Sequence, residues 1–181
     1  MFQHNFGKKF AVGGLLFCMY AYGFAADSIS FEVGTGDRTQ MARVGAQWNW
    51  KKEWWKSNGT HIGGYWDLTL AQWRANKFQN VPGRTQNITD IGITPVFRFE
   101  KDSRKGLYME AGIGAHYLSK HYDNDGGQLS TKFEFGDHIG AGYVFNNNVD
   151  LGIKIQHFSN GGIKKPNSGV NFAVIGLKYQ F

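Results

Sequence analysis

Apolar and polar residues alternate with a period of two along almost the whole chain from residue 28 onward, and no segment keeps the 3.6-residue period of an amphipathic helix. Successive side chains of a β-strand point to opposite faces, so this pattern predicts strands that each have one apolar and one polar face. Eight segments carry the pattern: 28–36, 40–50, 61–75, 86–99, 106–117, 132–144, 149–159 and 171–181. The chain is therefore predicted to be all-β.

The polar face of these segments distinguishes between two kinds of barrel. Glu110, Glu134 and Arg98 lie on it in mid-strand, where the closed core of a soluble barrel would tolerate charge poorly. The other face carries aliphatic residues with aromatic residues near the strand ends, which is typical of the lipid-facing surface of outer-membrane barrels. Together with a final strand that ends on Phe181, this predicts an eight-stranded antiparallel transmembrane β-barrel with a filled interior. A soluble ligand-binding barrel is the alternative fold.

The N-terminus has the composition of a secretory signal. Lys8 and Lys9 precede an apolar stretch over residues 10–22, and small residues follow it. We therefore expect residues 1–26 to be a signal peptide and residues 27–181 to form a single outer-membrane barrel domain.

The composition excludes several classes of protein and site. Cys18, the one cysteine, lies in the predicted signal, so a thiol nucleophile, a disulfide framework and a cysteine zinc site are not expected in the mature chain. No apolar run after the signal reaches the roughly 18 residues of a membrane-spanning helix. The formal net charge is +6, but no basic helix or aromatic platform accompanies it, so a nucleic-acid partner is not predicted. The histidines lack metal-ligand spacing, and neither a metal nor another cofactor is expected.

The segments between the strands follow from the barrel topology. With both termini on the periplasmic side, short turns face the periplasm and longer loops face outward. The predicted periplasmic turns are 51–60, 100–105 and 145–148, and the predicted extracellular segments are 76–85, 118–131 and 160–170.

A histidine and a serine share one face of the strand over 149–159. Leu151, Ile153 and Ile155 identify that face as the lipid-facing one, and His157 and Ser159 continue it near the extracellular end. Side chains two residues apart on a strand have Cβ atoms about 6 to 7 Å apart. This spacing suits a hydroxyl activated by an imidazole base, although polar residues are also ordinary at a membrane interface.

The stretch HFSNGGIKKPNSGVNF, from His157 to Phe172, resembles the hallmark of the PagL family of lipid A 3-O-deacylases. The stretch FEFGDHIGAGYVF, over residues 133–145, is similar to the same family, as is the plan of a signal followed by eight strands. The resemblance implies an outer-membrane serine esterase that hydrolyses the ester-linked 3-hydroxyacyl chain at position 3 of lipid A. It also implies Ser159 as nucleophile, His157 as base, and Asn160 and Gly162 as oxyanion-hole residues.

One position departs from the family pattern. The family has a glutamate fourteen residues after the base, and this chain has Asn171 there. Asn171 shares outward parity with Tyr179, and an asparagine carbonyl can orient an imidazole. Across the turn at 145–148, residue 139 is expected to face about residue 155, which brings Asp137 close to His157 with the same parity. Our hypothesis is that Asn171 orients His157 and that Asp137 assists electrostatically.

Basic residues lie in or near the predicted extracellular segments, where they are candidates to bind the phosphates of lipid A: Lys77, Arg84, Lys120, Lys132, Lys164 and Lys165. Lys164 and Lys165 are the better candidates because they follow the catalytic motif, although ordinary solvated loop charge explains the set equally well. The expected partners are lipid A, as part of lipopolysaccharide, and outer-membrane lipid, and the resemblance permits a homodimer.

Two functions remain open at this point. The first is the esterase, located in the bacterial outer membrane with its active site facing the outer leaflet. The alternative is a non-catalytic small outer-membrane barrel with an envelope-structural or adhesion role.

Overall fold

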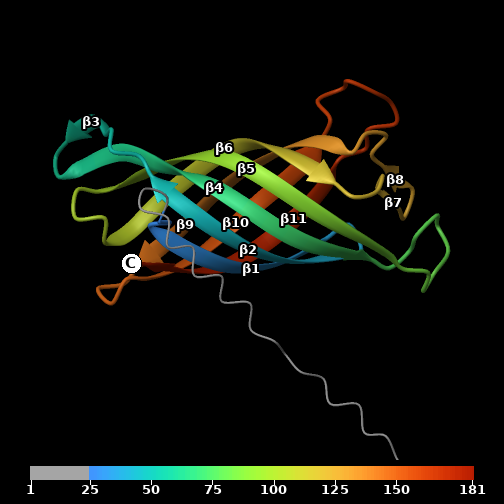
Figure 1. Ribbon diagram of the computed structural model, residues 1–181, viewed down its shortest axis with the longest axis horizontal. Coiled ribbons are helices and arrows are strands. Elements are labelled where there is room, and N and C mark those ends of the chain that lie inside the picture. Colours follow the sequence, from blue (N-terminus) through green and yellow to red (C-terminus); the bar gives the residue numbers. More distant parts are fainter. Residues whose placement is uncertain (1–24) are drawn as a thin grey trace, which may run out of the picture.

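The computed structural model of the chain describes residues 25–181, which consist almost entirely of β-strands (Figure 1). The strands are β1 (Ser28–Gly36), β2 (Thr39–Asn49), β3 (Trp54–Ser57), β4 (Thr60–Ala75), β5 (Gln86–Lys101), β6 (Gly106–Leu118), β7 (Asp123–Asn124), β8 (Gly127–Gln128), β9 (Phe133–Val144), β10 (Val149–Ser159) and β11 (Val170–Gln180). Each predicted segment is a strand whose ends differ from the prediction by at most two residues. The predicted signal peptide lies almost wholly outside the described residues and stays a prediction.

The strands close into an eight-stranded antiparallel barrel, as the alternation predicted. Neighbours follow the order β2-β1-β11-β10-β9-β6-β5-β4, and β4 pairs with β2 to complete the circle. Two short additions were not predicted: β3 extends the sheet beside β4, and β7 and β8 form a separate ribbon between β6 and β9. Among residues 25–181, no helix is long and apolar enough to cross a membrane.

The two ends of the barrel differ, and we name them by their connections. The loop end carries the long segments 76–85 and 160–169 and the β7–β8 ribbon, whereas the turn end carries β3, the turn at 145–148 and the C-terminus (Figure 1). These are the ends for which an extracellular and a periplasmic position, respectively, are expected.

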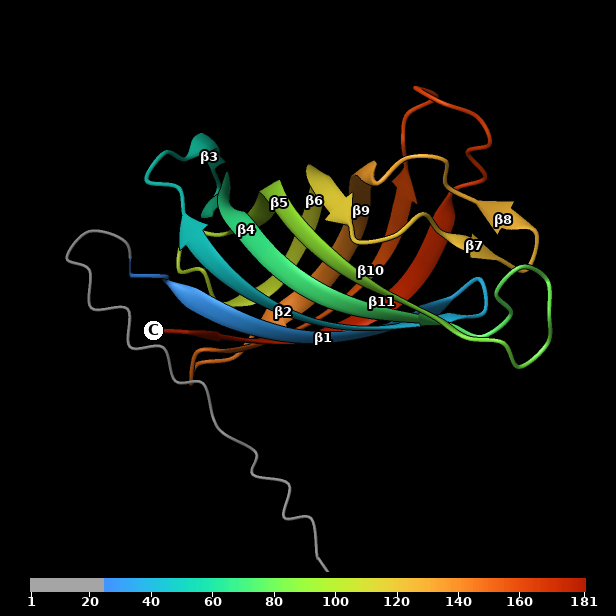
Figure 2. The same cartoon turned by 45° about the vertical axis from the view of Figure 1, so that its right-hand side comes forward.

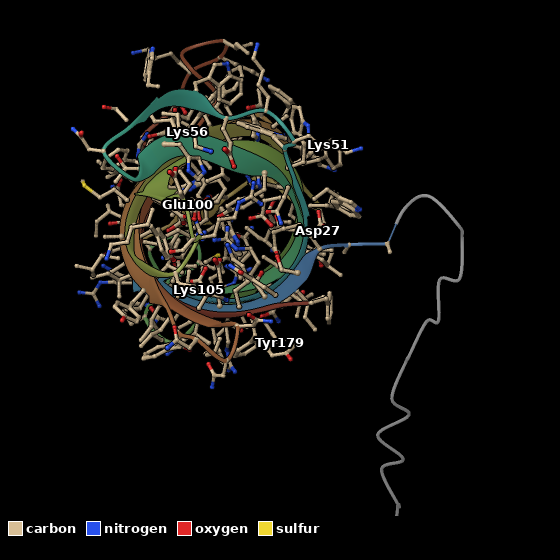
Figure 3. All side chains as sticks on the ribbon, turned by 90° about the vertical axis from the view of Figure 1, so that its left-hand side faces the viewer. Asp27, Lys51, Lys56, Glu100, Lys105 and Tyr179 are labelled. Atoms are coloured by element: carbon tan, nitrogen blue, oxygen red, sulfur yellow. The ribbon has the colours of Figure 1, made fainter. Side chains whose placement is uncertain are left out.

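Apolar side chains cover the outside of the barrel and side chains fill its inside. Along β10, Leu151, Ile153 and Ile155 are exposed on the outer face, while Gln156 and Phe158 between them are buried. Seen from the turn end, the interior is occupied by side chains (Figure 3). The prediction of a filled interior is therefore confirmed.

Charged residues in the turn-end half of the interior are paired with one another. The Arg98 guanidinium donates to Glu110 Oε2 at 2.6 Å and to Asp150 Oδ2 at 3.0 Å, and Tyr65 and Tyr108 donate to the same two carboxylates. Buried charge is tolerated when it is paired and hydrogen-bonded. This network explains why mid-strand charges occur in a chain with so apolar an outer surface.

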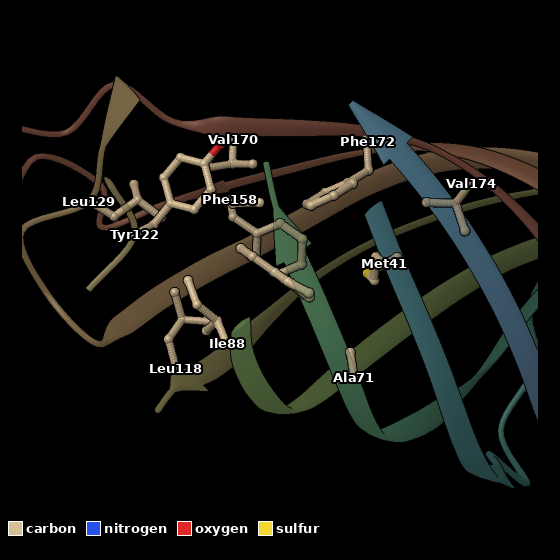
Figure 4. Packing of buried hydrophobic residues seen from close by; sticks show 12 residues of the cluster. Met41, Ala71, Ile88, Leu118, Tyr122, Leu129, Phe158, Val170, Phe172 and Val174 are labelled. Atoms are coloured by element: carbon tan, nitrogen blue, oxygen red, sulfur yellow. The ribbon is translucent and has the colours of Figure 1, made fainter. Parts of the chain in front are cut away.

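The inward-facing side chains were predicted to be polar. At the loop end they instead form an aromatic and aliphatic cluster (Figure 4). The Trp73 ring contacts the rings of Phe158 and Phe172 at centroid distances of 4.7 and 5.0 Å. Phe158 lies between His157 and Ser159 in the sequence, and Phe172 follows Asn171. Since neighbouring side chains of a strand point to opposite faces, this inward packing holds those three residues on the outside.

Candidate active site

His157 and Ser159 lie on the outer face of the barrel at the loop end of β10, as their parity predicted. Both are half-buried, whereas Gln156 and Phe158 beside them point into the interior and are fully buried. Figure 2 shows β10 and β11 side by side, with the segment that joins them rising at the same end as β7 and β8. The imidazole and the hydroxyl thus share the surface that carries the exposed aliphatic residues.

The strand register brings Asn171 and Asp137 to opposite sides of His157. Asn171 of β11 and Asp137 of β9 are both direct partners of His157, and Ile139 pairs with Ile155 as expected across the turn at 145–148. His157 Nδ1 lies 2.8 Å from Asn171 Oδ1. A carbonyl oxygen only accepts hydrogen bonds, so Nδ1 carries the proton and Nε2 is left as the basic nitrogen.

Asp137 is close to His157 without being hydrogen-bonded to it. The two residues are cross-strand neighbours, whose Cβ atoms lie about 4.5 to 5.5 Å apart. No hydrogen bond joins the Asp137 carboxylate to the imidazole, whose Nδ1 is already bonded to Asn171. The position of Asp137 is therefore compatible with an electrostatic effect only.

The Ser159 hydroxyl is not bound by the imidazole in this structure. Its oxygen accepts one long hydrogen bond of 3.4 Å, from the backbone N–H of Gly161. Catalytic hydrogen bonds are often longer in a substrate-free enzyme and tighten when substrate binds. Ser159 is thus on the correct face and two residues from the base, and its Oγ is available to an incoming group.

The backbone at Gly169, a residue that no sequence pattern identified, packs directly against the His157 imidazole. Gly169 has a φ of +75°, and a Cβ at this position would lie 2.4 Å from His157 Cε1. Only glycine combines this backbone conformation with so close an approach. The imidazole therefore lies between the backbone at Gly169 and the strands that flank β10. No local sequence pattern predicts this contact.

The segment after Ser159 is ordered by the Asn160 side chain. Asn160 is fully buried, its Nδ2 donates to the Lys164 carbonyl at 2.8 Å, and its Oδ1 accepts from the Gly162 N–H at 3.0 Å. A second Nδ2 contact, to Ser130 Oγ, is long at 3.5 Å. Both predicted oxyanion-hole residues thus lie directly beside Ser159, and in this structure they bond to each other.

The candidate phosphate-binding cations are dispersed. Lys164 and Lys165 lie exposed on the 160–169 segment next to the site. Lys77 instead pairs with Asp125, and Arg84 donates to Gln79 Oε1 at 2.9 Å. Within residues 25–181, no group of three His, Cys, Asp or Glu side chains is placed to hold a metal ion.

A further missed contact involves the turn between β1 and β2. The backbone N–H of Asn171 donates to Asp37 Oδ2 at 2.6 Å, although the two residues are 134 positions apart in the sequence. Such a contact exists only because β1 lies beside β11 in the closed barrel.

The chain is similar in sequence to known proteins of one family. The family model described as "Lipid A 3-O-deacylase (PagL)" matches residues 40–180. The lipid A deacylase PagL of Pseudomonas aeruginosa is 35% identical over 147 residues, which cover 81% of each chain. The protein of the same name from Bordetella bronchiseptica is 34% identical over 160 residues, covering 84% of this chain and 83% of that one.

The fold comparison gives the same result. The crystal structure of the outer membrane enzyme PagL superposes with a TM-score of 0.72 at 28% identity, over 85% of this chain and 99% of the other. The family match, over residues 40–180, includes the segment that carries His157, Ser159 and Asn171. The chain is therefore an outer-membrane protein and belongs to the PagL family of lipid A 3-O-deacylases.

Proposed function

We propose that this protein is a lipid A 3-O-deacylase that works as a serine esterase, releasing the ester-linked 3-hydroxyacyl chain at position 3 of lipid A from the outer leaflet. The observation that carries the proposal is the hydrogen bond from His157 Nδ1 to Asn171 on the outer face, the same face on which Ser159 lies. A base and a hydroxyl that face lipid can reach an ester whose acyl chains are embedded in that lipid.

The reaction is an acyl transfer in two steps. Ser159 Oγ attacks the ester carbonyl while His157 Nε2 takes its proton, and the proton then goes to the departing sugar oxygen as the ester bond breaks. In the second step a water molecule gives a proton to Nε2 and attacks the acyl-enzyme, which releases the fatty acid and restores the Ser159 hydroxyl. Asn171 keeps the proton on Nδ1 throughout, and Asp137 favours the positive imidazolium by its charge.

The oxyanion that forms in each step needs hydrogen-bond donors. Asn160 Nδ2 carries two hydrogens, of which one is bound to the Lys164 carbonyl and the other makes only the long contact with Ser130. That second hydrogen is our candidate donor. The N–H of Gly162 helps to orient this donor through its hydrogen bond to Asn160 Oδ1. The same N–H can donate to the oxyanion only if that hydrogen bond breaks. Removal of one such donor typically costs about 10²–10³ in rate.

An apolar concavity on the outer face suits the acyl chain. It has a volume of about 1080 Å³ and is lined by residues that include Ile155 and Ala173, the outward neighbours of His157 and Asn171 on their strands. Ile139, Ile153 and Ile175 continue the lining away from the loop end. An acyl chain that lies there would place its ester beside Ser159, with the sugar and its phosphates toward Lys164 and Lys165.

The test is release of free 3-hydroxy fatty acid from lipopolysaccharide by the purified protein, followed by mass spectrometry. We expect release by the unchanged protein and none by Ser159→Ala, which changes an outward hydroxyl and leaves the barrel folded. Heat-modifiable mobility on a gel checks that fold. Release that persists in Ser159→Ala would refute the serine mechanism, and no release by the unchanged protein would favour a non-catalytic barrel.

A further inference from the structure

The turn between β1 and β2 is packed against the backbone of Asn171. A Cβ at Gly36 would lie 1.9 Å from the Asn171 carbonyl oxygen, so the two backbones are in direct contact. Next to this contact, Asp37 Oδ2 accepts two hydrogen bonds from Asn171, from the backbone N–H at 2.6 Å and from the side-chain Nδ2 at 3.4 Å. A carboxylate therefore lies behind the residue that binds the catalytic imidazole.

The position of Asp37 is itself held by other parts of the loop end. Its backbone has a φ of +45°, and its carbonyl oxygen accepts from Tyr122 Oη at 3.1 Å and from Asn124 Nδ2 at 2.9 Å. The following residue, Arg38, forms an ion pair of 2.6 Å with Asp125. A hydrogen bond from Lys77, together with one from Arg38, lowers the pKa of Asp125, so this ion pair persists through neutral pH.

The carboxylate determines which way the Asn171 amide points. A carboxylate accepts hydrogen bonds and donates none, so the amide must turn its Nδ2 toward Asp37. Its Oδ1 then faces His157 Nδ1, at the observed 2.8 Å. With the amide reversed, Nδ2 would donate to Nδ1, the proton would move to Nε2, and the imidazole would have no basic nitrogen for Ser159.

We propose that Asp37 is a positioning residue of the active site, which sets the Asn171 amide and through it the tautomer of His157. The chain of contacts runs from the Asp37 carboxylate in the β1–β2 turn to the Asn171 amide on β11 and on to the imidazole on β10. Its catalytic consequence rests on the proposed serine mechanism. The tautomer itself is a property of the folded protein and can be measured without substrate.

Kinetics of a double-mutant cycle test the proposal. We expect Asp37→Ala to lower kcat by about 10²-fold with little change in KM, since a wrong histidine tautomer is severely damaging in serine enzymes. Asp37→Asn keeps the size of the side chain and one accepting oxygen, so we expect a smaller loss, about tenfold. In an Asn171→Glu background the glutamate accepts from the His157 Nδ1–H in either orientation. Asp37→Ala should therefore lower kcat by less than about threefold in that background.

A matched control separates this role from general loosening of the turn. Asp125→Asn removes another carboxylate that anchors the same turn, through Arg38, but it has no contact with Asn171. It should keep nearly full activity. If Asp37→Ala lowered kcat equally in the unchanged protein and in the Asn171→Glu background, the proposal would be overturned, because Asp37 would then have a purely structural role.

The second measurement is the ¹⁵N chemical shift of the His157 ring nitrogens in detergent micelles, assigned with a His157→Gln variant. The unchanged protein should show the Nδ1–H tautomer and Asp37→Ala a mixture of the two. An unchanged tautomer in Asp37→Ala would overturn the proposal whatever the kinetics. If Ser159→Ala retained activity, the serine mechanism would fail, and the tautomer would still decide the role of Asp37.

Discussion

Two histidine-centred groups in this barrel have the same order of partners and different surroundings. In the interior, His116 Nδ1 lies 3.0 Å from Asp90 Oδ1, and its Nε2 lies 3.5 Å from the Thr94 hydroxyl. On the outer face, His157 Nδ1 lies 2.8 Å from Asn171 Oδ1, with Ser159 two residues further along the strand. By chemistry alone the interior group is the better triad, because it has a carboxylate.

Access distinguishes the two groups. Asp90, His116 and Thr94 are each at most 4% exposed, and a Cβ at Gly92 would lie 2.2 Å from the His116 ring, so no substrate can enter. The outer group is half-exposed on a lipid-facing surface, next to the apolar concavity. In a filled barrel, the face on which a polar group lies therefore decides whether a substrate can reach it.

The largest difference is expected when each histidine is replaced by alanine. His157→Ala should lower activity by about 10³-fold without lowering thermal stability, because the proposed general base is lost from the surface. His116→Ala should destabilise the barrel by about 3–5 kcal/mol, since the buried Asp90 loses its partner, and the folded fraction should keep activity within about threefold. Fatty-acid release and thermal unfolding on the same samples check both statements. A reversed pattern would show that the interior group is the catalytic one.

The next largest effect is expected at Gly169. Alanine there would displace the His157 imidazole, whose Cε1 lies 2.4 Å from the new Cβ position, and activity should fall by about 10²-fold. Gly59→Ala is the matched control, because Gly59 has almost the same φ, +76° against +75°, and nothing within 4 Å of its Cβ position. Similar activity losses in the two variants would mean that backbone strain, and not contact with the imidazole, is responsible.

A smaller effect is expected at Asp137. Asp137→Asn keeps the shape and removes a charge that acts on His157 only through space, so activity should fall by about fivefold. Asn171→Ala, which removes the hydrogen bond to His157 Nδ1, should lower kcat by about 10²-fold. Parallel kcat measurements on both variants check the order. A loss at Asp137 as large as that at Asn171 would identify the carboxylate as the true orienting group.

The smallest effect is expected at Lys164 and Lys165. The double change to alanine should raise KM for lipopolysaccharide by about threefold, since exposed charge pairs contribute little each. The effect should shrink at high salt, which screens such contacts. Lys56→Ala, at the turn end, is the control and should leave KM unchanged. A KM that does not respond to the loss of both lysines would show that their charge is ordinary loop charge.

Much of the fold followed from the sequence, for a local reason. Each strand shows its two faces in its own residues, so the eight segments, their register across the turn at 145–148, and the outward direction of His157 and Ser159 were all predictable. The aromatic cluster inside the loop end was harder to predict. Phe158 and Phe172 have inward parity, but only their packing on Trp73 shows that this part of the interior is apolar.

The sequence by itself determined which side chains meet lipid and which fill the barrel, because the period of two is a property of each strand alone. It also placed the imidazole and the hydroxyl two residues apart on one face. Only the tertiary structure decided the other contacts around the imidazole, beyond its neighbours Asn171 and Asp137 on the paired strands. Barrel closure puts β1 beside β11 and so brings Asp37 to Asn171, while the segment before β11 brings Gly169 against the ring. Contacts between residues so distant along the chain have no local pattern, since they depend on how the strands are paired.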